Sequence, residues 1–338
     1  MAQNRILLTS SEIACLWTSY MNDSMSKCIM SFFLEHTEDE EIHKLVKHTL
    51  GIASAHLDKI EAFFIDEDIP VPIGFPIEKH VNLNAPRLYT DMFKLTYINH
   101  MARVGLLGYG GFISMSARKD IRNYYMDGLQ ETSELYDKAS DIALSKGLFV
   151  RTPYIAYPSE RDYVDSRKYL SGFSLFSKQR PLNVVEISHL AMNIQTNIMG
   201  AKLALSFAQT SPRKDVQNWL MRGSEISKKH VKVFSSMLLD NNIHAPAPSD
   251  ISITDSTVPP FSDQLILFHM SLLSATGTGN YATAAAASQR SDLILNYERL
   301  SLEIAQYAKD GAYIMIENKW LEQPPGTIDK EKLSEKKE

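Results

Sequence analysis

The chain has 338 residues, of which 44% are hydrophobic and 22% are charged, and its formal net charge is −5. This length corresponds to about two domains, and the composition allows each of them to bury a core. The negative charge and the lack of a basic stripe with interleaved aromatic residues argue against a nucleic-acid-binding surface. We therefore expect a soluble globular protein that has no nucleic-acid partner.

Two stretches bear on the cellular location. The start of the chain, Met1 to Ile6, lacks the apolar segment and the cleavage site of a secretory signal, which predicts a cytoplasmic protein. The stretch from Leu265 to Ser288 has no charged residue, but His269, Asn280 and several hydroxyl groups make it a poor membrane span. We expect no membrane span, and we interpret this stretch as a helix buried between two bundles or two subunits.

The first helix of each half carries its own start signal. Thr9 can cap a helix that continues to about His36, with Glu12 reaching back from the third helical position. Asn183 and Glu186 repeat this spacing in the second half of the chain. A glutamate at the same place in both halves could be taken for a ligand or a catalytic acid, but we interpret both as capping residues.

The second helix of each half contains a histidine inside an apolar stripe. Apolar residues spaced by three and four predict helices that start at Thr37 and Ser211 and contain His56 and His230. The two histidines are 174 positions apart, and their surroundings repeat at the same offset, which indicates an internal duplication. The matching pairs are Phe33 with Phe207, Asp66 with Asp240, Ile69 with Ile243, and Pro72 with Pro246.

A proline-rich connection follows the second helix in both halves. Proline lacks the backbone N–H and restricts φ, so this segment is predicted to be an extended strap. About 18 extended residues span more than about 50 Å, which lets the second and third helices run parallel. The third helices pair Gly105 with Gly277 and the fourth pair Glu131 with Glu303, at an offset of 172. This connectivity is the ferritin-like variant of the four-helix bundle.

The predicted fold class is all-α, with two tandem ferritin-like four-helix bundles over residues 7–150 and 181–325. The segment 151–180 between them is rich in aromatic residues, which favours an ordered linker packed along a bundle over a loose tether. Its aromatic residues include Tyr154, Tyr157, Tyr163, Tyr169, Phe173 and Phe176. The final segment, 326–338, is charged and is predicted to be a flexible tail.

The histidines invite comparison with ferritin-like di-metal sites. Those sites use a Glu from each of two helices and a Glu-x-x-His from each of the other two. Ala53 and Ser227 stand three residues before His56 and His230, so this motif is broken in both halves. The pattern argues against a dinuclear centre, and we expect no cofactor.

Two interpretations of the histidine layer remain open. In one, His56 and Glu131 form a buried polar network, because burying such groups unpaired costs about 1–3 kcal/mol. In the other, glycine leaves room for a small ligand or a metal in each bundle, held by the histidine and the glutamate. The candidate residues are His56, Tyr109, Tyr125 and Glu131 in the first bundle, and His230, Tyr281, Tyr297 and Glu303 in the second.

A third repeated feature is the pattern Ser-x-Arg-x-Asp, at Ser116 to Asp120 and at Ser288 to Asp292. With the repeated histidine and the proline-rich strap, it makes residues 7–325 resemble the tandem family called domain of unknown function 3231, of spore-forming Bacillus-type bacteria. The bundles of that family are similar to spore coat protein F. The resemblance implies a doubled ferritin-like fold and a role in sporulation or stress, and it carries over no catalytic residues.

These observations support two hypotheses about function. The first is a non-catalytic structural or interaction protein, with protein partners or self-association, and with spore association implied by the family resemblance. The alternative is a diverged metal-binding or small-ligand-binding protein that uses the layer of His, Glu and Tyr side chains in each bundle.

Overall fold

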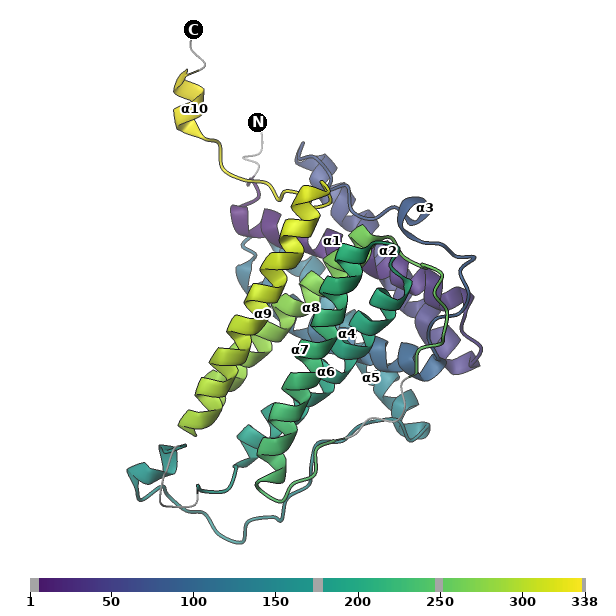
Figure 1. Ribbon diagram of the computed structural model, residues 1–338. Coiled ribbons are helices and arrows are strands. Elements are labelled where there is room, and N and C mark those ends of the chain that lie inside the picture. Colours follow the sequence, from purple (N-terminus) through teal and green to yellow (C-terminus); the bar gives the residue numbers. More distant parts are fainter. Residues whose placement is uncertain (1–5, 173–178, 247–251, 336–338) are drawn as a thin grey trace.

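The computed structural model describes residues 6–172, 179–246 and 252–335, which are almost entirely helical apart from loops and two isolated β-bridges. Two four-helix units lie side by side (Figure 1). The prediction of an all-α, two-part fold is confirmed. The first unit comprises α1 (Ser10–Glu35), α2 (Glu40–Asp66), α4 (Asp91–Met115) and α5 (Lys119–Ser145), and the second α6 (Val184–Thr210), α7 (Lys214–Leu239), α8 (Asp263–Ala287) and α9 (Ser291–Glu317).

The helices of each unit are connected in the same way. Helix α1 packs on α2 and α4 packs on α5, while α1 also contacts α4 and α2 contacts α5. The second unit repeats this arrangement with α6, α7, α8 and α9. Short turns join the first helix to the second and the third to the fourth, whereas the long strap, which in the first unit contains α3 (Ile77–His80), joins the second to the third. This is the connectivity of ferritin-like bundles.

The predicted start of α1 is confirmed and has a second role. The Thr9 side chain accepts a hydrogen bond from the Glu12 N–H, and the Glu12 carboxylate accepts one from the Thr9 N–H. The same carboxylate accepts hydrogen bonds from the N–H groups of Ala117 and Arg118, at 2.9 and 2.7 Å, in the turn between α4 and α5. One buried glutamate therefore ties the first helix to the turn between the third and fourth.

The predicted starts of α2 and α7 are wrong by two residues. The N-cap of α2 is Asp39, because its carboxylate accepts hydrogen bonds from two N–H groups of the first turn. The Thr37 hydroxyl instead donates to a carbonyl at the end of α1. The N-cap of α7 is Arg213, and the Ser211 hydroxyl donates to the Asp263 carboxylate on α8 at 2.7 Å.

The two straps pair with each other. Antiparallel bridges join Val81 to Phe261 and Tyr89 to Ile253, so the strap of one unit lies against the strap of the other. Because the straps are extended, their backbone N–H and C=O groups are free to pair in this way. The pairing links the two halves of the duplication at equivalent places.

Helix α8 lies at the contact between the units, as predicted for the uncharged stretch. The Tyr97 hydroxyl of α4 lies 3.1 Å from Nε2 of His269 on α8, and the Phe75 and Phe268 rings are 5.0 Å apart. The largest cluster of buried hydrophobic residues includes side chains from both units. Among the described residues, none of the helices combines the length and apolar character that crossing a bilayer requires.

The linker differs from the prediction that it packs along a bundle. Tyr154, Tyr157 and Tyr163 are 83%, 95% and 95% exposed, so their rings do not pack against a bundle. Tyr169 does pack, with the Arg180 guanidinium 4.0 Å from its ring centroid. The predicted Phe173 and Phe176 lie outside the described residues.

The predicted flexible tail contains a short helix, α10 (Lys330–Glu335). Lys, Glu and Leu are strong helix formers, and the Asp329 carboxylate accepts a hydrogen bond from the Glu331 N–H at the start of the helix. Figure 1 shows α10 standing away from the bundles, so local propensity and this cap account for the helix.

Replacing the buried glutamate of the second unit tests its structural role. Glu186 is 0% exposed and binds Arg180 at 2.7 Å and the Arg290 N–H at 3.0 Å. We expect Glu186→Gln to lower the free energy of unfolding by about 2–4 kcal/mol, because an amide cannot replace a carboxylate towards these donors. Urea unfolding at pH 7 measures the change, with the exposed Glu225→Gln as control; equal stabilities of the two variants would contradict the prediction.

The pH dependence of the same pair gives a second measurement. Burial raises the pKa of Glu186, but its hydrogen bonds to Arg180 and the backbone outweigh burial and hold the pKa below its usual value. A lowered folded-state pKa contributes stability above the pKa of the unfolded state, and this contribution is lost as the pH falls through the folded value. The stability gap between wild type and Glu186→Gln should therefore narrow in acid.

Candidate functional site

The histidine of the first unit lies between all four helices. His56 on α2 is 2% exposed, and its Nε2 lies 2.6 Å from Oε2 of Glu131 on α5. Its Nδ1 lies 2.9 Å from the Tyr109 hydroxyl on α4 and 3.5 Å from Oδ2 of Asp23 on α1. A side chain at Gly128 would place its Cβ 2.7 Å from the Tyr109 ring, so glycine is needed there to admit the tyrosine.

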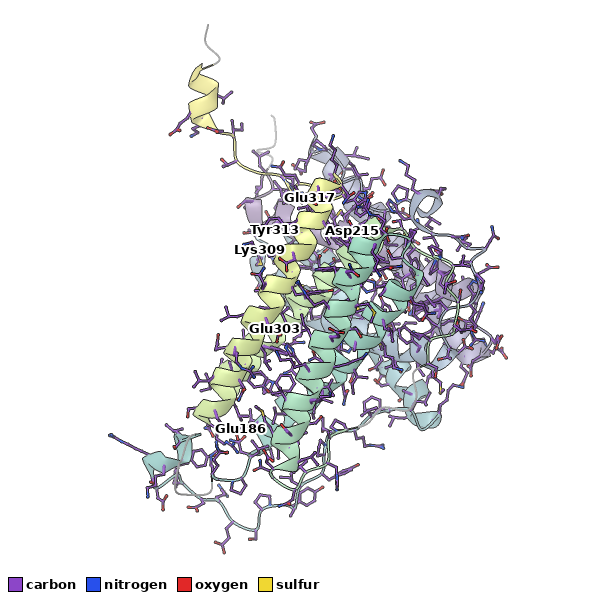
Figure 2. The ribbon with its side chains drawn as sticks, viewed as in Figure 1. Glu186, Asp215, Glu303, Lys309, Tyr313 and Glu317 are labelled. Carbon is purple, nitrogen blue, oxygen red and sulfur yellow. The ribbon has the colours of Figure 1, made fainter. Side chains whose placement is uncertain are left out.

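The second unit repeats the layer with one change. His230 is fully buried, its Nδ1 lies 2.8 Å from the Tyr281 hydroxyl, and its Nε2 lies 3.0 Å from Glu303. Figure 2 shows Glu303 midway along α9, where Lys229 also binds its carboxylate at 2.7 and 2.9 Å. Asn197, 174 positions after Asp23, donates its amide N–H to the Tyr281 hydroxyl at 2.7 Å.

The hydrogen bonds of the second unit favour one direction. The Asn197 amide nitrogen also donates to the Asn193 carbonyl, which determines the orientation of the amide. Because Tyr281 accepts from Asn197, the arrangement in which every donor has an acceptor has the Tyr281 proton donated to Nδ1 of His230 and the Nε2 proton donated to Glu303. His230 is neutral in this arrangement. Burial lowers the pKa of His230, and the opposing effect of Glu303 does not restore it.

The first unit lacks this directional constraint. An ionised Asp23 can only accept hydrogen bonds, so it cannot act as Asn197 does. Burial lowers the pKa of His56, but Asp23 and Glu131 more than offset this effect and raise the pKa above its usual value. Burial also raises the pKa of Asp23. The difference between Asp23 and Asn197 therefore accompanies opposite pKa shifts of the two histidines.

Not every predicted residue joins the histidine. The Tyr125 hydroxyl lies 3.5 Å from the Ser19 hydroxyl, and the Tyr297 ring packs against the Tyr281 ring at 5.7 Å. The neighbouring Tyr124 contacts His56 instead, with ring centroids 5.7 Å apart. The sequence analysis also missed Asp23, although the 174-residue offset that relates His56 to His230 pairs it with Asn197.

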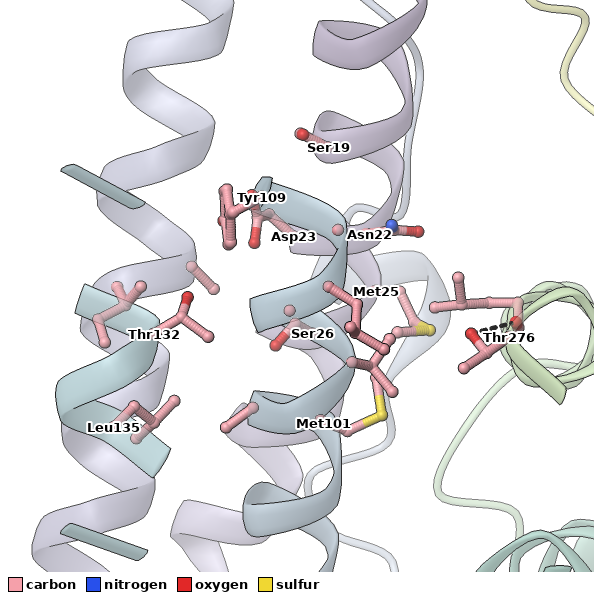
Figure 3. Close-up of a pocket in the computed structure, with 18 of the residues that line it drawn as sticks. Ser19, Asn22, Asp23, Met25, Ser26, Met101, Tyr109, Thr132, Leu135 and Thr276 are labelled. Atoms are coloured by element: carbon pink, nitrogen blue, oxygen red, sulfur yellow. Dashed lines mark hydrogen bonds between the residues drawn. The ribbon is translucent and has the colours of Figure 1, made fainter. Parts of the chain in front are cut away.

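A cavity of about 550 Å³ lies beside the first histidine. Its walls come from the four helices of the first unit and from α8 of the second. Figure 3 shows Asp23 and Tyr109 near one end, Met25 and Met101 farther along, and Thr276 across from them. The wall is largely apolar, with several hydroxyl groups and the carboxyl group of Asp23.

The matching place in the second unit is filled. The cavity beside His230 measures about 60 Å³, and Ile304 and Tyr307 lie in its wall. These residues stand 172 positions after Thr132 and Leu135, which line the larger cavity of the first unit. Tyr307 also stacks on Trp219 with ring centroids 4.3 Å apart. Larger side chains on the same framework therefore replace the cavity.

The two ring nitrogens of His56 are also the atoms through which a histidine binds a metal ion. Both ring nitrogens of His56 already have partners, so an ion would have to displace Tyr109 or Glu131. Across residues 6–172, 179–246 and 252–335, no group of three or more His, Cys, Asp or Glu side chains is arranged to hold a metal.

The family model described as "Protein of unknown function (DUF3231)" matches residues 1–160 and 171–333. The chain belongs to the DUF3231 family. A similar solved structure is a Bacillus halodurans protein described as a "putative spore coat protein", 19% identical, with a TM-score of 0.42. The match covers 44% of the present chain and 98% of the Bacillus halodurans chain. No curated protein matches the chain. The two matched segments correspond to the two units of the fold.

Exchanging the acid and the amide tests the electrostatics of this DUF3231 protein. We expect Asp23→Asn to lower the pKa of His56, because one of the two carboxylates that raise it is removed. Asn197→Asp should raise the pKa of His230 for the converse reason. Imidazole nitrogen spectra recorded as a function of pH measure both, with His56→Gln and His230→Gln to assign the signals. Titration curves that do not move with either exchange would contradict this account.

Proposed function

We propose that this DUF3231 protein is a non-catalytic small-molecule-binding protein, with the ligand in the first unit and the second unit as scaffold. The observation that supports the proposal most directly is the cavity of about 550 Å³ beside His56. Small-molecule sites commonly measure about 300–1,000 Å³ and combine apolar walls with a few polar groups. The cavity has both properties.

The comparison between the units strengthens this proposal. Both contain the same helices and the same buried histidine, yet the second has only about 60 Å³ at the matching place. The fold therefore does not require a large cavity, and the smaller side chains of Thr132 and Leu135 open it. Met25 and Met101 in its wall are flexible and polarisable, which suits an apolar ligand.

The opening of the cavity provides a route for the ligand. Leu107, Gly279 and Thr283 line the cavity and are exposed, so they place its mouth on α4 and α8. Helix α8 belongs to the second unit. The second unit therefore contributes part of the entrance as well as support for the fold.

Filling the cavity tests the proposal. A neutral fluorescent probe, N-phenylnaphthylamine, should bind the wild type at one molecule per chain. Thr132→Ile, which introduces the residue found at position 304, should weaken binding about tenfold or more, because the added carbons occupy the site. Fluorescence titration gives the dissociation constants.

Two further variants make this test specific. The double variant Thr49→Gly, Leu135→Tyr fills the cavity in a second way. Thr49 and Leu135 correspond to Gly223 and Tyr307 of the second unit. There, the Tyr307 side chain occupies the space that a side chain at position 223 would take. Ile304→Val changes the matching position in the other unit and should leave probe binding unaltered. The proposal fails if the probe binds equally well to wild type and to both filled variants.

A second candidate is a structural or interaction role, as expected from the sequence and including spore association. The exposed Tyr154, Tyr157 and Tyr163 favour it, since tyrosine is enriched at protein interfaces. On this hypothesis the chain self-associates through the linker, and replacing all three residues by serine should abolish the association. Sedimentation velocity of the two proteins over a range of concentrations provides the measurement.

A further inference from the structure

The polar end of the cavity contains a carboxyl group with no lysine or arginine beside it in the described part of the wall. Among the described residues that line it, Asp23 is the only carboxylate, and there is no lysine or arginine. Glu131 lies behind His56 and contacts its Nε2 at 2.6 Å. Two carboxylates face one imidazole. When both are ionised, even a protonated His56 leaves one negative charge in the group. Because Glu131 makes the closer contact with His56, this charge is assigned to Asp23.

One oxygen of Asp23 is also without a hydrogen-bond donor. Oδ2 is buried and has no hydrogen-bond partner among the described residues. Nδ1 of His56 is 3.5 Å away, beyond the usual N–H···O range of about 2.7–3.2 Å, and lies 2.9 Å from the Tyr109 hydroxyl. A buried carboxylate oxygen without a donor is unfavourable, so a donor supplied by a ligand would stabilise it.

Aromatic rings line the same cavity as this carboxylate. Tyr109 and Phe112 both line the cavity, with ring centroids 6.4 Å apart. The faces of aromatic rings attract cations, and a cation that has left water gains most from them. The uncompensated charge, the missing donor and the rings all favour the same chemical group, a positively charged nitrogen that carries N–H bonds.

We propose that the ligand of the first unit is an apolar amine, whose ammonium group donates to Asp23 and whose hydrocarbon part extends towards Met25 and Met101. This rests on the proposed small-molecule-binding function and adds the chemical class of the ligand. The second unit shows the contrasting case, because Asn197 uses its amide to donate to Tyr281 and leaves no charge for a cation.

Three probes of equal chain length test the charge preference. Octylamine, octanol and octanoate are titrated into the wild type by calorimetry at pH 7. Octylamine should bind about tenfold to hundredfold more tightly than octanol, since its hydrogen bond to Asp23 is charge-assisted. Octanoate should bind most weakly of the three, because its carboxylate would face Asp23.

Variants locate the preference at Asp23. Asp23→Asn should reduce octylamine binding to the level of octanol and leave octanol unchanged, while Thr132→Ile should weaken both. Asn197→Asp places a carboxylate in the filled unit and should leave octylamine binding unaltered. Circular dichroism establishes that each variant is folded. If Asp23→Asn does not fold, the relative affinities of the wild type for octylamine, octanol and octanoate still test the charge preference.

The outcomes separate the two proposals. Equal binding of octylamine and octanol, or a preference that persists in Asp23→Asn, overturns the amine assignment, whereas binding lost in Thr132→Ile still supports a small-molecule site. If the wild type binds neither the octyl compounds nor N-phenylnaphthylamine, the small-molecule site and the amine assignment are both overturned.

Discussion

The two four-helix units complete one another's hydrophobic core, and the rest of the fold depends on this mutual burial. Helix α8 has no charged side chain after Asp263, and an unpartnered face of this kind would be unfavourable in water. The buried cluster that crosses the units and the paired straps cover much of it. The duplication has therefore produced one packed body with two similar halves, in which helices of one half can line a cavity in the other.

Within this body the two halves differ around the same buried histidine. In the second, Asn197, Tyr281 and Glu303 form a hydrogen-bonded chain through His230, and burial lowers the pKa of that histidine. In the first unit, the carboxyl group of Asp23 stands where the second unit has the amide of Asn197. A cavity lies where the second unit has packed side chains. A duplicated chain allows this division, because one copy can keep its packed side chains while the other contains a cavity.

Much of this arrangement follows from local patterns. The spacing of Thr9 and Glu12 predicted the capping box, and the repeat predicted that His56 and Glu131 belong to one layer. The starts of α2 and α7 lie two residues later than predicted, and the hydroxyls of Thr37 and Ser211 donate to Phe33 and Asp263 instead of capping a helix. Asp23 belongs to no spacing motif, so only its pairing with Asn197 across the repeat distinguishes it.

The sequence by itself determined the helical class, the duplication and the long strap, because apolar periodicity, prolines and a constant offset are local properties of the chain. Only the tertiary structure decided which half is hollow. In the first unit Thr132 and Leu135 line the cavity together with Ala53 and Met101, which come from two other helices. In the second unit the larger Ile304 and Tyr307 fill the matching place. A cavity is the volume left after many side chains pack, and no single segment of sequence encodes it.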